Sequence, residues 1–237
     1  MLVHGRDEER CRAAAERIGR ETECPAPPYY VADLSSLARV RELAERVEAE
    51  NPRLDALVNN AGIVTRQREL SAEGYELTFA VNYLSHFLLT LLLLPAIERS
   101  APARIVNVAS IGQTPIDFDD VMLERGWEPY RAYAQSKLAQ IMFTFELAER
   151  RGGGVTVNTL HPATLMDTKM VRETFGRAST SVDEGAEATV WVVTAPDLEG
   201  VGGRFFDGKR EARAHARAYD AEARRGLWAL SERLCGL

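Results

Sequence analysis

The sequence contains little cysteine, and its cysteines do not form the close pairs that indicate disulfides or metal sites. Cys11, Cys24 and Cys235 are the only three. An odd number of cysteines, without a signal-peptide pattern at the start, is typical of a reducing compartment. The acidic segment 116–120 has no histidine or cysteine within it, and a hard-cation site needs more oxygens in a tight loop. We therefore expect a cytoplasmic protein that binds no metal.

The sequence also lacks a strong excess of basic charge and an uninterrupted membrane-spanning segment. Its formal net charge is −6 at pH 7, so no broad positive field would attract nucleic acid. The most apolar stretch, residues 79–97, contains Asn82, Ser85 and His86 and is interrupted by Pro95. A spanning helix needs ~20 predominantly apolar residues. We therefore expect no nucleic-acid partner and no membrane span, and we interpret this stretch as a helix buried in a domain and against a partner subunit.

Short apolar runs alternate with helical patterns along the whole chain. The runs predict strands at Leu2–His4, Tyr29–Ala32, Ala56–Asn59, Ile105–Val108, Val155–Leu160 and Arg204–Phe206. The helical patterns predict helices at Asp7–Gly19, Leu37–Asn51, Ala72–Ser100, Tyr130–Arg150, Val182–Ala195 and Glu211–Leu234. Continuous apolar strands between helices are typical of a parallel sheet covered on both faces. Because there is no internal repeat and no linker, residues 1–237 are expected to form one α/β domain.

Three polar residues stand where they could interconvert a carbonyl and an alcohol. Tyr133 and Lys137 are four residues apart, so they share one face of a predicted helix. A neighbouring cation favours the phenolate and lowers a tyrosine pKa that starts at about 10, which would let Tyr133 exchange protons near neutral pH. Ser110 ends the apolar run 104–110, where its hydroxyl could bind the same reacting oxygen.

These residues occur in a fixed order with Asn82 and the segment Asn59-Asn60-Ala61-Gly62. In this order the sequence resembles the short-chain dehydrogenase/reductase family, from about residue 1 to beyond Phe206. The insert 116–120 and the run Tyr130-Arg-Ala-Tyr133-Ala-Gln-Ser-Lys137-Leu-Ala are similar to its retinol-dehydrogenase-like branch. The resemblance implies a Rossmann-type, doubly wound parallel sheet and an NAD(P)-dependent oxidoreductase.

The resemblance also implies a role for each of four residues in catalysis. Tyr133 would donate or take the proton of the substrate oxygen. Lys137 would lower the pKa of Tyr133 and bind the nicotinamide ribose. Ser110 would hydrogen-bond the substrate oxygen. Asn82 would hold a water near the lysine and complete a proton relay.

Further residues match positions at which the family binds its cofactor. Arg6 follows the first predicted strand, where a basic residue favours the 2′-phosphate of NADP over NAD. The matching positions, together with Tyr133 and Lys137, are Arg6, Asp33, Asn59, Asn60, Ala61, Gly62, Pro162 and Thr168. The family usually has glycine after Pro162, whereas this chain has Ala163, and Thr164 stays an alternative to Thr168. His161, which precedes this proline, is interpreted as a structural residue at a strand end.

The chain departs from the family at its start, because it lacks the turn Thr-Gly-x-x-x-Gly-x-Gly that receives the pyrophosphate at a helix N-terminus. The segment 1–6 resembles the family's second strand, so we expect the domain to be N-terminally incomplete by one strand and one helix. The glycines at 152–154 and 200–203 are interpreted as turns rather than phosphate loops. In the order 3-2-1-4-5-6, the missing strand would leave a gap of roughly 10 Å unless the sheet closes. A late start site, a fragment and a natural loss stay open as explanations.

Apolar residues near the site suggest a lipophilic aldehyde, ketone or alcohol as substrate. They lie in the insert with Phe118, Trp127 and Tyr130, and in the segment 166–181. The helices expected at 72–100 and 130–150 carry more apolar surface than one sheet face should cover, which predicts a homodimer or homotetramer built on them. The alternative is a non-catalytic relative that serves as a dimerising scaffold with impaired cofactor binding.

Overall fold

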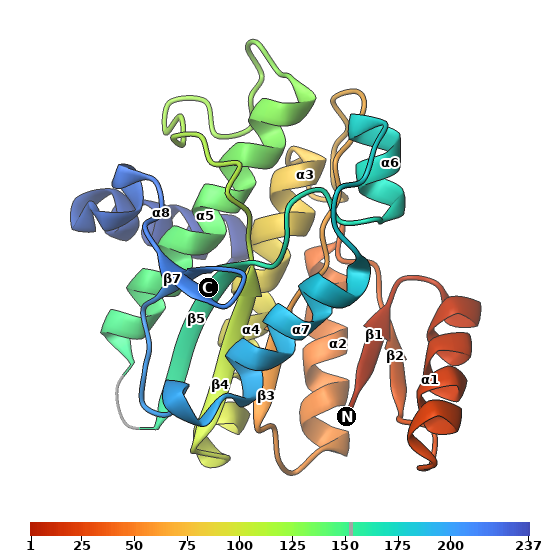
Figure 1. Cartoon of the computed structure of the whole chain (residues 1–237). Helices are drawn as coiled ribbons and strands as arrows, with labels where there is room; N and C mark the ends of the chain where they lie inside the picture. The colour runs from red at the N-terminus through yellow and green to blue at the C-terminus, as the bar shows by residue number, and fades with distance from the viewer. Residues whose placement is uncertain (152–153) are drawn as a thin grey trace.

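The computed structural model describes residues 1–151 and 154–237, in which strands alternate with helices (Figure 1). The strands are β1 (Val3–Gly5), β2 (Tyr29–Val31), β3 (Ala56–Asn59), β4 (Ala103–Val108), β5 (Val155–His161), β6 (Phe205–Asp207) and β7 (Arg210–Ala212). The longer helices are α1 (Glu8–Thr22), α2 (Leu37–Glu50), α4 (Ser85–Arg99), α5 (Pro129–Arg150), α7 (Val182–Thr194) and α8 (Ala221–Cys235). The short helical segments are α3 (Leu77–Phe79), η1 (Ala80–Leu84), α6 (Lys169–Phe175), η2 (Pro196–Leu198) and η3 (Ala216–Tyr219). Two residues of the expected turn at 152–154 lie outside this part of the chain.

The strands form two sheets. β3, β4, β5 and β6 are parallel neighbours in that order, and β7 adds an antiparallel edge. β1 and β2 form a separate parallel pair. Apolar side chains of β4 and β5 pack on both faces of the larger sheet, with α4 and α5 on one face and α7 on the other. The α/β class with a mainly parallel sheet, expected from the sequence, is confirmed.

The gap expected in the sheet lies between β1 and β3. In the described part of the chain, neither strand has a partner along its facing edge, and a groove of about 830 Å³ borders both. Leu89 and Leu93 of α4 line it, as does Val190 of α7. Val58 of β3 is left 38% exposed and Val190 58% exposed.

The volume of the groove is about that of roughly five extended residues, if a strand in a packed sheet occupies a cross-section of about 4.8 by 10 Å. Apolar side chains such as Leu89 and Val190 line it together with polar ones such as Asn59 and His86. That a strand can occupy this position stays a prediction.

The helix predicted at 211–234 is wrong in its first third. Residues 210–212 instead form β7, which pairs with β6 through the register Asp207↔Arg210. The tight turn between the two strands is possible because Gly208 adopts φ +60°, a conformation that glycine reaches without steric cost. The helix α8 begins only at Ala221, where the Asp220 side chain accepts hydrogen bonds from two backbone amides of its first turn.

The long helix predicted at 72–100 begins five residues later than expected, at Leu77. The Glu76 carboxylate accepts a hydrogen bond of 2.7 Å from the Phe79 amide and so caps the first turn. The preceding residues form a turn in which the Ser71 amide bonds to the Tyr75 carbonyl. Helix α6, capped by Thr168, was not expected at all, because its seven residues are too few for a periodic signal.

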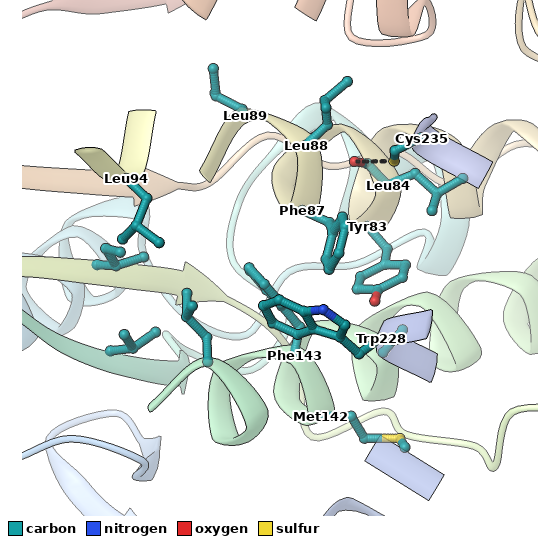
Figure 2. Packing of buried hydrophobic residues seen from close by; sticks show 14 of the residues in the cluster. Tyr83, Leu84, Phe87, Leu88, Leu89, Leu94, Met142, Phe143, Trp228 and Cys235 are labelled. Atoms are coloured by element: carbon teal, nitrogen blue, oxygen red, sulfur yellow. Dashed lines mark hydrogen bonds between the residues drawn. The ribbon is translucent and has the colours of Figure 1, made fainter. Parts of the chain in front are cut away.

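The largest core of the protein lies where α4, α5 and α8 meet. Tyr83, Phe87, Phe143 and Trp228 form a cluster with ring centroids 5.0 to 6.4 Å apart for the neighbouring pairs, counting Phe79 (Figure 2). Such aromatic pairs contribute beyond their buried area. The Tyr83 hydroxyl is paired with the Ser231 hydroxyl of α8 at 2.7 Å.

This packing covers the apolar helix surface from which a homodimer or homotetramer was predicted. The apolar faces of α4 and α5 are already covered within one chain, because α8 packs on α5 and most of 132–147 is buried. The surplus apolar surface expected from the sequence is therefore not present. The oligomeric state itself stays a prediction without this support.

By length and composition, the apolar helix Leu77–Arg99 could cross a membrane. In the structure, 83% of its most apolar window is buried inside the fold. The burial agrees with the interpretation of this stretch as a core helix.

We expect the substitution Phe143→Ala to destabilise the protein strongly. Phe143 is 2% exposed and contacts three aromatic rings, so truncation leaves a cavity that costs about 3–5 kcal/mol. Urea denaturation followed by circular dichroism would measure the loss. Val182→Ala, at an exposed position of α7, is the control and should change the free energy of unfolding little. A loss below about 1 kcal/mol for Phe143→Ala would contradict this account of the core.

Candidate active site

Ser110, Tyr133 and Lys137 come together at the carboxyl end of β4. Ser110 follows this strand by two residues, and the Lys137 Nζ donates a 2.9 Å hydrogen bond to the carbonyl of Val108, the last residue of the strand. The Ser110 side chain lies near enough to Tyr133 to lower the pKa of its phenol, against the larger effect of burial, which raises it. The three side chains therefore open onto one site, at the sheet edge where open α/β folds bind ligands.

Tyr133 is a less acidic phenol here than the sequence led us to expect. Burial raises the pKa of Tyr133, the nearby Ser110 side chain lowers it, and the neighbouring Tyr130 raises it. The Lys137 Nζ lies 5.6 Å from the centre of the Tyr133 ring. Because burial also lowers the pKa of Lys137 to about 7, the lysine is only partly charged near neutral pH, so it provides less stabilisation of a phenolate than a full cation would.

A second phenol lies close to Ser110. A Cβ atom added at Gly112 would be 3.2 Å from the Tyr130 hydroxyl and 3.5 Å from the Ser110 Oγ. The Gly112 amide also donates to the Ser110 Oγ at 3.1 Å. Glycine at this position therefore leaves room for the Tyr130 hydroxyl near the serine.

Lys137 is held by two acceptors although it is 4% exposed. Its Nζ donates to the Val108 carbonyl and, at 2.8 Å, to the Oε1 of Gln140. An ammonium has three N–H donors, so one N–H stays available to a ligand. A Cβ at Gly62 would lie 3.6 Å from the Nζ, which places the lysine beside the loop that follows β3.

Asn82 joins that loop to helix α5. Its Oδ1 accepts a 2.8 Å bond from the Ile63 amide, and its Nδ2 donates to the Ile63 carbonyl and to the Ser136 hydroxyl, each at 3.0 Å. The Ser136 hydroxyl in turn donates to the Tyr133 carbonyl at 2.7 Å. Asn82 lies in η1, which is a π-helix, and such wide turns are frequent at functional sites. The side chain thus joins two protein segments as a clamp, and its expected role of holding a water stays a prediction.

The residues Asn59 to Gly62 continue β3 beside the groove, but they differ in what they expose. The Asn59 side chain is 2% exposed and donates to the Thr90 hydroxyl and to the Asn107 amide oxygen. Its amide therefore stabilises the sheet and the helix behind it. Asn60 is exposed, Ala61 and Gly62 are partly buried, and Asn60 and Ala61 line the groove.

Arg6 and Asp33 occupy matching places after β1 and β2. Both are exposed, so both can meet a ligand at this edge. The Asp33 Oδ1 accepts a 2.9 Å bond from the Ser35 amide, which is the turn-forming role that aspartate often has. Asp33 thus has a structural use, and it is compatible with the cofactor role expected from the sequence.

In the segment after β5, the side chains expected to meet the cofactor also make contacts within the protein, and their cofactor role stays a prediction. The Thr168 hydroxyl accepts a 3.3 Å bond from the Val171 amide and caps α6. Pro162 is buried. The His161 Nε2 is paired with the Thr164 hydroxyl at 3.0 Å, which supports its structural interpretation. In this structure neither threonine has a hydroxyl free of protein contacts.

Two residues of the site were missed from the sequence. Gln140 bonds Lys137, and the Gln140 Nε2 contacts the His86 Nδ1 at 2.9 Å. Gln140 could have been found, because it lies three residues after Lys137 and so shares its helix face. His86 comes from another helix, and no local pattern connects the two.

A second hollow, of about 990 Å³, lies at the opposite end of the sheet. It is lined by the starts of β4 and β5, together with Arg224 and Tyr219. It contains none of the residues expected in the site, so its size is not an argument for the chemistry described here.

We expect Asn82→Leu to open the loop after β3. The substitution leaves the Ile63 amide and carbonyl without their side-chain partner, at a cost of about 1–3 kcal/mol for each unsatisfied group. Hydrogen–deuterium exchange should show the Ile63 amide losing protection. Asn60→Ala, at the exposed neighbouring amide, should leave that protection unchanged. Equal protection of Ile63 in the Asn82→Leu variant would show that the clamp is not what orders this loop.

Comparisons with known proteins agree with the fold. The family model described as short chain dehydrogenase matches residues 1–178. Retinol dehydrogenase 13 of Mus musculus is 40% identical over 256 residues, covering 100% of this chain and 76% of the relative. Polyprenol dehydrogenase of Mus musculus is 37% identical, with the same coverage of 100% and 76%. Among solved structures, the Pseudomonas aeruginosa RhlG/NADP active-site complex superimposes with a TM-score of 0.67 at 28% identity, covering 87% of this chain and 83% of that one. The chain belongs to the short chain dehydrogenase family, on its retinol-dehydrogenase-like side.

Proposed function

We propose that the protein is an NADP-preferring oxidoreductase that interconverts a lipophilic alcohol and its aldehyde or ketone. The observation that carries this proposal is the meeting of Ser110, Tyr133 and Lys137 at one end of β4. Membership of the family supports oxidoreductase chemistry of this kind.

In this proposal each side chain acts on one atom. The Ser110 hydroxyl binds the substrate oxygen and orients it toward Tyr133. The Tyr133 phenol gives its proton to that oxygen during reduction and takes it back during oxidation. Lys137 holds its free N–H toward the site and stabilises negative charge on the phenol. The nicotinamide cofactor, when bound, supplies or accepts the hydride.

The described residues fit one end of such a cofactor better than the other. Near Gly62, the spare N–H of Lys137 and the small loop residues leave room for a ribose and a nicotinamide. The turn from β1 into α1 is unsuited to a pyrophosphate, because Asp7 caps this helix and Glu8 and Glu9 fill its first turn. Those carboxylates would repel an anion at a helix N-terminus that otherwise attracts one.

The preference for NADP rests on Arg6. Its guanidinium follows β1 and is exposed, where it could pair with a 2′-phosphate. The similar structure from Pseudomonas aeruginosa is titled as an NADP complex, which supports the same choice.

A lipophilic substrate is supported by the surface beside Ser110 and by two relatives. Ile111 is 52% exposed and Tyr130 is 55% exposed, and Phe118 belongs to the same insert. The names of the two mouse relatives refer to retinol and polyprenol, both apolar alcohols.

We propose a cytoplasmic location on the basis of the free cysteines.

The groove favours a second candidate function, that of a non-catalytic relative serving as a scaffold. Two open strand edges and an acidic first helical turn would both weaken cofactor binding. Cofactor binding and turnover separate the two candidates.

We expect this chain to bind NADPH weakly. Two missing charge-assisted hydrogen bonds to the pyrophosphate, at about 1.5–3 kcal/mol each, weaken binding by a factor on the order of a hundred or more. Calorimetric titration would compare the chain with a version extended at its N-terminus by an apolar strand, a glycine-rich turn and a helix. The extended protein should bind more tightly and reduce lipophilic aldehydes. Equal, tight binding by both would reveal another phosphate site and contradict our account of the groove.

In the extended protein, we expect Tyr133→Phe to abolish turnover with little change in the Kd for NADPH, because only the exchanging proton is lost. Tyr130→Phe is the matched control, since its phenol is the other one near Ser110, and it should retain turnover. Steady-state rates with NADPH oxidation as the signal would measure both. Loss of turnover in Tyr130→Phe alone would transfer the role of the acid to Tyr130.

A further inference from the structure

Lys137 is the first member of a chain of buried polar side chains that leads away from the substrate site. Its Nζ donates to the Gln140 Oε1 at 2.8 Å, and the Gln140 Nε2 lies 2.9 Å from the His86 Nδ1. Gln140 is 1% exposed and His86 is 2% exposed. The chain thus joins α5 to α4 beneath the site.

While Lys137 is charged, the donors and acceptors of this hydrogen-bonded series can be arranged in only one direction. An ammonium donates and cannot accept, so Gln140 must present its carbonyl oxygen to Lys137. The Gln140 amide nitrogen then faces His86 and donates to the Nδ1. A neutral imidazole that accepts at Nδ1 carries its hydrogen at Nε2.

The hydrogen-bonded series ends at the His86 Nε2, a donor without an acceptor. In the described part of the chain, the His86 Nε2 is buried and has no hydrogen-bond partner, and His86 borders the groove between β1 and β3. Burial, and secondarily the charge of Lys137, lower the pKa of His86 to about 3. His86 is therefore neutral over the physiological range, as the one-directional chain requires.

We propose that Gln140 and His86 are positioning residues for Lys137. Gln140 fixes the direction of the Nζ and stabilises its charged form, and His86 holds the Gln140 amide in the required orientation. With the Val108 carbonyl on a second N–H, the third N–H of Lys137 is left for a ligand hydroxyl. The inference rests on the proposed role of Lys137 in the site, but its test requires neither cofactor nor turnover.

The same helix provides a matched control. Gln135 is also 1% exposed, and its side chain donates to the Val121 carbonyl and accepts from the Asp117 amide. It makes two buried hydrogen bonds, as Gln140 does, but it does not contact Lys137. Gln135→Leu therefore removes two side-chain hydrogen bonds at a buried position, as Gln140→Leu does, without changing the hydrogen bonds of Lys137.

The first measurement is the titration of Lys137 itself. The sequence has only three lysines, Lys137, Lys169 and Lys209, so lysine-selective ¹⁵N labelling gives three side-chain signals, two of them from exposed residues. The titratable groups that interact with Lys137 or His86 are Tyr133 on α5, His161 at the end of β5 and His4 on β1. They are unchanged in every variant compared.

We expect Gln140→Leu to lower the titration midpoint of Lys137 by about one pH unit or more, because a hydrogen bond to the charged form is lost. His86→Leu should lower it less, since the Gln140 carbonyl remains. Gln135→Leu should leave it nearly unchanged. A shift in Gln135→Leu equal to that in Gln140→Leu would overturn the proposal.

The second measurement is the tautomer of His86, read from long-range ¹H–¹⁵N spectra of the four histidines. The wild-type protein should show the hydrogen on Nε2. Gln140→Glu replaces a donor by a carboxylate that only accepts, so His86 should change to the Nδ1–H form and the Lys137 midpoint should rise. This variant keeps an acceptor for Lys137, so the proposal can still be tested if Gln140→Leu does not fold. A wild-type Nδ1–H tautomer, or an unchanged tautomer in Gln140→Glu, would refute the proposed hydrogen-bonded series from Lys137 to His86.

Discussion

The burial of one ammonium group, that of Lys137, is the constraint on which the site depends. A buried charge is tolerated only where hydrogen-bond partners replace water. The partners here come from β4 and from α5, and Gln140 is held in turn by His86 of α4. One charge therefore connects the sheet to two helices. Asn82 adds the loop after β3 to the same assembly through Ile63 and Ser136, so that Tyr133, Lys137 and Gly62 keep their relative positions.

The divided sheet places this well-ordered site next to an open groove. On one side of the groove, β3 and β4 are paired over four residues and lead into the loop after β3 and into Ser110. On the other side, the β1–β2 pair carries Arg6 and Asp33. A ligand that contacts both sides would have to cross the groove, and a helix that begins with two glutamates offers its phosphates little attraction. The residues expected to act on the substrate and those expected to bind the adenosine end of the cofactor thus lie on opposite sides of the groove.

Sequence reasoning succeeded where the signal is local. The strand Ala56–Asn59 was predicted with its observed bounds, because an apolar run between turn residues has few alternatives. The strand β6 was predicted one residue early, at 204–206, whereas β7 was missed, because the polar residues 207–212 show no strand alternation and 210–212 form a strand only by pairing with β6. The oligomer expected from apolar helix faces lost its support, because α8 packs on α5 and α2 packs on α4 within the chain.

The sequence by itself determined the family, the α/β class and the identity of the polar residues at the strand ends, because each of these depends on order and spacing along the chain. Only the tertiary structure decided what those residues contact. It buried the Asn59 amide in the sheet, used Thr168 as a helix cap and made Asn82 a clamp. It also brought His86 and Gln140 together, 54 residues apart. The physical reason is that a buried polar group must bond to whatever neighbour packing provides, and packing is set by contacts between elements that are distant in the sequence.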